Sequence, residues 1–127
     1  MLEHFDRNNI NKVLFEWSRV LKKGGVLRVA VPDFDKIASE YLKNKNLEIL
    51  LGLLYGGQTY QYNYHYQGFD FNRLENLLTT NGYINIARYD WKDFLPADYD
   101  DYSRAYIPHM DFENGTLMSL NVLAKKK

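Results

Sequence analysis

A helix, a glycine turn and an apolar strand follow one another between residues 8 and 33. Apolar side chains recur there at the three- and four-residue spacing of an amphipathic helix, at Ile10, Val13, Leu14, Trp17, Val20 and Leu21. Gly24-Gly25 ends this helix, because glycine adopts the left-handed C-cap backbone at the least steric cost. Residues 26–31 are β-branched and almost wholly apolar, which is typical of a strand covered on both faces. The segment therefore predicts one unit of an α/β layered fold.

The rest of the chain predicts three further helices and two further strands. Asp33 is placed to cap a helix over 34–43, and Asp70 to cap a helix over 71–80. A short apolar helix is expected before Gly56-Gly57, over 47–55. The expected strands cover 83–91 and 116–124, with loops over 58–68 and before Gly115 and a solvated lysine tail over 125–127.

Composition limits the classes of function. The 127 residues suit a single domain, and 46% hydrophobic with 25% charged residues is ordinary for a globular chain. Sixteen basic residues balance sixteen acidic ones, so net charge favours neither nucleic acid nor an anionic membrane as a partner. The sequence has no cysteine, which excludes disulfides and thiolate metal ligands. We expect a cytoplasmic protein, because no apolar run could cross a bilayer and no signal peptide is evident.

Several stretches of the sequence resemble a known protein family. Residues 2–5 read LEHF, residues 19–25 read RVLKKGG and residues 31–33 read VPD. These motifs resemble the middle of class I S-adenosylmethionine-dependent methyltransferases of the type 11-like group. Lys23 stands in place of the family's usual proline. Four later stretches resemble a subgroup of small methyltransferases that is associated with sugar and cell-envelope pathways. They are GGQ at 56–58, NYH at 63–65, DDYS at 100–103 and MSLN at 118–121.

The resemblance implies a partial, Rossmann-like methyltransferase fold of the α/β class. Residues 26–31, 83–91 and 116–124 would be strands 5, 6 and 7 of the family's seven-stranded sheet. They would form a mostly antiparallel three-stranded sheet in the order 5-7-6, with about four helices. Residues 1–127 would then be one domain, the C-terminal, substrate-side half of the enzyme. The family's GxGxG cofactor turn is missing from the sequence, so we expect S-adenosylmethionine not to bind this chain alone.

The same resemblance predicts a partner. Without its family neighbour, strand 4, the strand over 26–31 becomes a sheet edge with unpaired N–H and C=O groups. We expect this edge to pair with a second copy of the chain, giving a homodimer, or with a partner that carries the cofactor-binding half. Completed in that way, the chain would transfer a methyl group to a small acceptor, and it would be inactive alone. The alternative is a non-catalytic, methyltransferase-like module for dimerisation or partner binding.

Candidate site residues lie in the LEH segment and in the aromatic segment 55–71. By resemblance, Glu3 and His4 lie near the cofactor and the transferred methyl group, where His4 could act as a base. Their place in the sequence also favours a frayed terminus with no active role. His65 is the second catalytic candidate, between tyrosines that could stack on a sugar. The expected substrate-binding residues are Gln58, Asn63, Tyr64, Asp100 and Asp101.

Three other kinds of site are disfavoured by the sequence. Segment 55–71 contains no lysine or arginine, which a stacking platform for single-stranded nucleic acid requires. The aspartates between residues 90 and 101 lack the alternating pattern of a calcium loop. The three histidines include no pair at i, i+4 spacing, so the sequence predicts no metal site.

Overall fold

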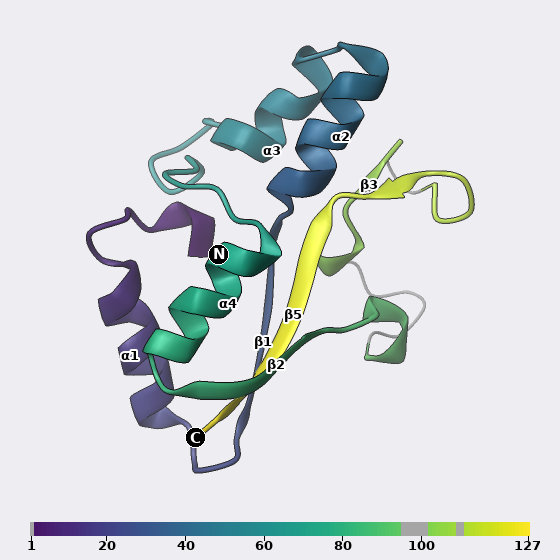
Figure 1. The fold of residues 1–127 in the computed structure, drawn as a ribbon. Helices are drawn as coiled ribbons and strands as arrows, with labels where there is room; N and C mark the ends of the chain where they lie inside the picture. The colour runs from purple at the N-terminus through teal and green to yellow at the C-terminus, as the bar shows by residue number, and fades with distance from the viewer. Residues whose placement is uncertain (1, 95–101, 109–110) are drawn as a thin grey trace.

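The computed structural model describes residues 2–94, 102–108 and 111–127, which form an α/β fold (Figure 1). Its α-helices are α1 (Ile10–Val20), α2 (Phe34–Asn44), α3 (Leu51–Tyr55) and α4 (Phe71–Thr80). Short 3-10 turns are η1 (Leu2–His4), η2 (Glu48–Leu50), η3 (Trp91–Asp93) and η4 (Tyr102–Arg104). The strands are β1 (Val26–Pro32), β2 (Tyr83–Arg88), β3 (Tyr106–Ile107), β4 (Thr116–Leu117) and β5 (Ser119–Lys126). In this described part of the chain, no helix combines the length and the apolar character that crossing a bilayer requires.

The main sheet is three-stranded and antiparallel, with β5 at its centre. β5 pairs with β1 in an unbroken register from Val26 opposite Lys125 to Pro32 opposite Ser119. Its other edge pairs with β2, whose register shifts between Ile84 and Ala87. Numbered along this chain, the order is β1-β5-β2 rather than 5-7-6. Equating β1, β5 and β2 with the family's strands 5, 7 and 6 requires the methyltransferase resemblance. The strand order alone does not establish that family.

Several element boundaries differ from the sequence prediction. β2 ends at Arg88 rather than at residue 91, because Asp90 caps a 3-10 turn by accepting a hydrogen bond from the Lys92 N–H. The expected strand over 116–124 is broken at Met118, whose N–H donates to the Ala105 carbonyl at 2.7 Å. The expected lysine tail is also wrong in part, since β5 continues to Lys126 and pairs there with β2.

One hydrophobic core lies between the sheet and the helices α1 and α4, which occupy the same side of it (Figure 1). α1 contributes Ile10 and Leu14, and α4 contributes Leu74 and Leu78, as their helical spacing predicts. The expectation that β1 is covered on both faces holds only for its second half, because Val26 and Arg28 at its start are exposed. A smaller apolar cluster of Ile37, Leu50 and Met118 joins α2 to η2.

Tyr83, the first residue of β2, links the sheet to α1. Its side chain is buried, and its hydroxyl donates a hydrogen bond to the Leu14 carbonyl at 3.2 Å. Burial raises the pKa of Tyr83 above its ordinary value of 10.0, because the phenolate would lose its hydration. The unfolded chain therefore loses this proton first as pH rises. The stability that Tyr83 contributes is present below pH 10.0 and is lost as pH rises through the higher pKa of the folded state.

The variant Tyr83→Phe tests this contribution. We expect it to lower the free energy of unfolding by about 1 kcal/mol at neutral pH, where one hydrogen bond is lost. At alkaline pH the difference from the wild type should shrink, because the variant has no buried phenol to ionise. Urea unfolding at both pH values measures the effect, with Tyr62→Phe, whose tyrosine is 74% exposed, as the matched control. A difference that stays constant with pH would contradict the assignment.

Candidate functional site

The first turn of the chain, η1, is packed into the fold. Leu2 and Glu3 are both buried, so the sequence-based expectation of a frayed terminus is wrong for these residues. The Tyr66 N–H donates to the Glu3 carbonyl at 2.7 Å, and the Gln67 side-chain amide donates to the Phe5 carbonyl at 2.6 Å. Two residues of the loop between α3 and α4 therefore hold η1 in place.

That loop is the second component of the site. Residues 58–68 contain no helix or strand, as the sequence predicts. The loop folds back on itself, because the Asn63 carbonyl accepts a hydrogen bond from the Gln58 N–H at 3.2 Å and the His65 N–H donates to the Tyr55 carbonyl at 3.0 Å. Gly56, with φ of 81°, supplies the left-handed backbone at the start of the reversal. His65 is thereby returned to the end of α3.

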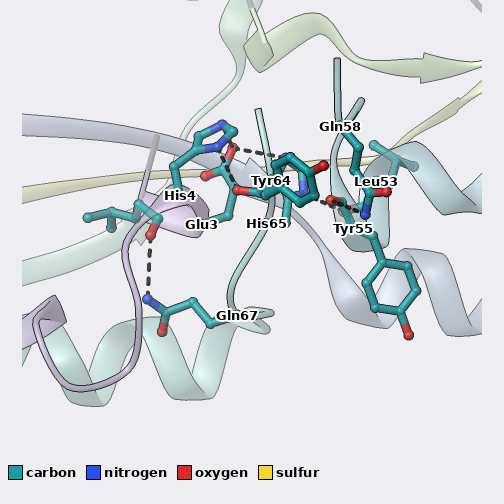
Figure 2. Close-up of polar contacts among 9 residues, drawn as sticks. Glu3, His4, Leu53, Tyr55, Gln58, Tyr64, His65 and Gln67 are labelled. Carbon is teal, nitrogen blue, oxygen red and sulfur yellow. Dashed lines mark hydrogen bonds and ion pairs between the residues drawn. The ribbon is translucent and has the colours of Figure 1, made fainter. Parts of the chain in front are cut away.

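Glu3, His4 and His65 come together where η1 meets this loop (Figure 2). A Glu3 carboxylate oxygen, Oε1, lies 3.7 Å from Nε2 of His4 and 3.9 Å from Nε2 of His65. The two imidazole rings meet edge to face, with their centroids 4.9 Å apart. The Glu3 and His65 side chains are only 4% and 8% exposed, whereas that of His4 is 29% exposed. The cluster is therefore buried on one side and accessible from the side of His4.

Backbone carbonyls fix the orientation of both imidazoles. Nδ1 of His4 lies 2.9 Å from the Tyr64 carbonyl oxygen, and Nδ1 of His65 lies 2.9 Å from the Leu53 carbonyl oxygen. A carbonyl only accepts hydrogen bonds, so Nδ1 of each ring carries a proton. In a neutral ring, Nε2 then has a free lone pair, and both Nε2 atoms face the Glu3 carboxylate.

His65 is held in its neutral form. Burial lowers the pKa of His65 below its ordinary value of 6.5. The hydrogen bond to Leu53 and the charge of Glu3 oppose this shift, whereas the charge of His4 adds to it. Because burial is the largest of these effects, His65 is neutral at pH 7 and can accept a proton or a cation at Nε2.

The expected substrate-binding residues take different places in the structure. Gln58 is exposed, while the Asn63 side chain donates to the Thr59 hydroxyl at 2.9 Å and so shapes the loop. Tyr64 contributes its carbonyl to the site through His4, and its ring is exposed. Asp100 and Asp101 lie outside the described residues. Sequence reasoning missed the Leu53 and Tyr64 carbonyls, because a backbone atom leaves no signal in residue identity.

The MSLN stretch at 118–121 has a structural role. All four of its residues are buried. The Ser119 hydroxyl donates to the Asn121 side-chain oxygen at 2.6 Å, and the Asn121 amide donates to the Ser103 carbonyl at 2.8 Å. The bond from Asn121 to Ser103 attaches η4 to β5. The stretch therefore holds the fold together rather than lining the accessible side of the cluster.

The cluster lies close to an open edge of the sheet. In the described residues, β1 pairs with β5 alone, and only beyond its end does Asp33 form a bridge to Phe69. η1 packs against β1, and a hollow of about 290 Å³ lies between them, lined by Leu2, Trp17 and residues 27–30. Residues attached to this edge would therefore lie next to η1, which carries Glu3 and His4.

Comparison with known proteins gives no relative for this arrangement. No protein-family model, no curated protein and no solved structure matches the chain. A function for this chain is therefore inferred from the geometry of the cluster, from the open edge of β1 and from the resemblance of the sequence stretches described above.

Proposed function

We propose that this chain is the acceptor-side part of a class I S-adenosylmethionine-dependent methyltransferase, acting on a small acceptor once a cofactor-binding half completes the sheet. The observation that carries the proposal is the position of the Glu3–His4–His65 cluster beside the open edge of β1. In the resembled family, the LEH segment lines the pocket near the transferred methyl group, and a further strand lies beside the strand that β1 would represent. The acceptor class, sugar or cell-envelope related, follows from the resemblance of the later sequence stretches.

We do not expect this chain to form a cofactor pocket by itself. The GxGxG turn, which lets backbone approach the cofactor, is missing from the sequence. The part that the chain can supply is proton transfer and positioning. Nε2 of the neutral His65 can take a proton from an acceptor hydroxyl or amine, and Glu3 would stabilise the resulting imidazolium across 3.9 Å. The exposed tyrosines 62, 64 and 66 offer flat faces for a sugar ring.

Calorimetry with S-adenosylmethionine tests the proposal in two steps. The 127-residue chain alone should show no binding heat. A complex with a cofactor-binding half, encoded next to this chain or supplied as a separate polypeptide, should bind the cofactor and methylate an acceptor. His65→Gln should lower kcat of that complex by about 100-fold or more, the usual contribution of a general base. Cofactor binding by the isolated chain would contradict the proposal that a separate half binds S-adenosylmethionine.

The alternative function is a non-catalytic module that dimerises or binds a partner through β1. It is favoured by the same open edge and by the apolar hollow beside it. Sedimentation of the wild type and of Leu27→Lys separates the two functions, because Leu27 lines that hollow. If pairing through β1 is the whole function, the lysine should abolish association, and no cofactor-binding half should produce activity. Val20→Lys, on an exposed part of α1, is the control and should associate like the wild type.

A further inference from the structure

We propose that Glu3, His4 and His65 form a binding site for a divalent transition-metal ion of the zinc class, with Nε2 of both histidines and a Glu3 carboxylate oxygen as ligands. A bound ion would occupy the Nε2 lone pair of His65 that accepts the proton in the proposed methyl transfer, so metal binding is a separate use of the same three residues. The sequence predicts no metal site. Its spacing gives no signal for this one, because the ligands lie on two segments about sixty residues apart.

The ligand set suits such an ion. Two imidazoles and one carboxylate are the protein ligands of open catalytic zinc sites and of other first-row divalent metals. In this cluster, one ligand atom from each residue lies within 4.8 Å of the other two. Two ligands of a tetrahedral zinc ion, with bonds of about 2.0–2.1 Å, lie about 3.3 Å apart. The three atoms therefore need to approach one another by roughly 0.5–1.5 Å to complete the coordination.

The orientation of the rings supports a cation between them. Each Nδ1–H is directed at a backbone carbonyl, which leaves the Nε2 lone pair facing the carboxylate oxygen. A cation held between these atoms would be bound by all three groups. A hydrogen bond from the outer ring nitrogen to a carbonyl is also the usual support of a metal-bound histidine, because it fixes the tautomer and the ring plane.

The Glu3 carboxylate makes no direct hydrogen bond to either Nε2 atom. An imidazolium that donates to a carboxylate brings nitrogen and oxygen to about 2.7–2.9 Å. Here the two separations from Oε1 are 3.7 Å and 3.9 Å, nearly equal and both longer than a hydrogen bond. This spacing leaves room for an ion between the three groups once they approach one another.

Three protein ligands leave at least one coordination position for water or for a small molecule. A hollow of about 340 Å³ borders His4, the most exposed of the three ligands, and Asp6, Tyr62 and Tyr66 also line it. A hydroxylated small molecule entering from this side would meet the open position of the ion.

Titration of the chelator-treated 127-residue chain with Zn²⁺ and with Co²⁺ at neutral pH tests the site. Calorimetry should detect one ion per chain, and bound Co²⁺ should give the visible absorption of a four- or five-coordinate nitrogen and oxygen site. Glu3→Gln and His65→Gln should each weaken binding by at least about 100-fold, because a lost ligand matters more than a lost supporting hydrogen bond. Two matched controls, Glu113→Gln and His109→Gln, should keep the wild-type affinity.

A second measurement separates loss of the site from loss of the fold. Zn²⁺ should raise the Tm of the wild type and of both control variants, because an ion that binds only the folded state stabilises it. It should leave the Tm of His65→Gln unchanged, while circular dichroism reports whether that variant is folded. Should the variant not fold, the Co²⁺ spectrum of the wild type decides the question. Equal affinity in all five proteins, or only millimolar binding by the wild type, would overturn the proposal.

Discussion

Replacing Leu2 with alanine is expected to lower the free energy of unfolding by about 2–5 kcal/mol, as large-to-small changes in a packed core do. Leu2 is 0% exposed and packs with the core residues of β1 and α4, although it lies in the first turn of the chain. The cavity would remove the main apolar contact of η1, which carries Glu3 and His4. We therefore expect the variant to lose the geometry of the cluster as well as stability.

Urea unfolding measures the first effect, with Leu42→Ala as the matched control. Leu42 is 68% exposed on α2, so its truncation should change the free energy of unfolding by less than about 0.5 kcal/mol. The second effect is visible in the NMR signals of the His4 and His65 rings, which should shift in Leu2→Ala and stay in place in Leu42→Ala. Similar stabilities for the two variants would show that η1 is not anchored through Leu2.

Alanine substitutions at Gly56 and Gly52 should change stability in opposite directions. Gly56 has φ of 81° and ψ of 173°, a conformation open essentially to glycine alone, and a Cβ there would overlap the Asn63 carbonyl. Gly56→Ala should therefore lower the free energy of unfolding by about 1–3 kcal/mol and displace the loop that carries His65. Gly52 lies within α3, where a Cβ would meet no atom within 4 Å, so Gly52→Ala should add about 0.5–1 kcal/mol.

The pair is measured by urea unfolding under identical conditions, since each protein gains one methyl group and no charge. The His65 ring signals report the second effect, because a Cβ on Gly56 would come within 3.1 Å of a ring carbon of His65. The same sign of change in both variants would mean that the loop does not depend on the backbone of Gly56.

Local signals predicted most of the helices. The apolar spacing of α1 and α4 and the caps Asp33 and Asp70 act within a few residues, so the sequence is sufficient to place them. The break in the last expected strand could not be predicted in this way. Met118 bonds to Ala105, and β4 pairs with β3, so the chain follows partners that no local pattern identifies. The start of β1 is exposed for the same reason, because coverage depends on distant elements.

The candidate site was predictable only in its residue types. The resemblance singles out Glu3, His4 and His65, but their meeting depends on the reversal of the loop at Gly56 and Asn63. The tautomers depend on two carbonyls that any residue could provide. Spacing rules for metal ligands detect pairs on one helix or one turn, and they fail when a 3-10 turn and a distant loop supply the ligands.

The position of β5 at the centre of the sheet also fixes an order of events during synthesis. In the described part of the chain, β1 and β2 bond to β5 and not to each other, and β5 follows both of them in the sequence. While the ribosome is still making residues 119–126, both earlier strands lack their hydrogen-bonding partner. The sheet therefore closes only after translation of β5, and until then apolar strand edges are exposed to chaperones and to other nascent chains.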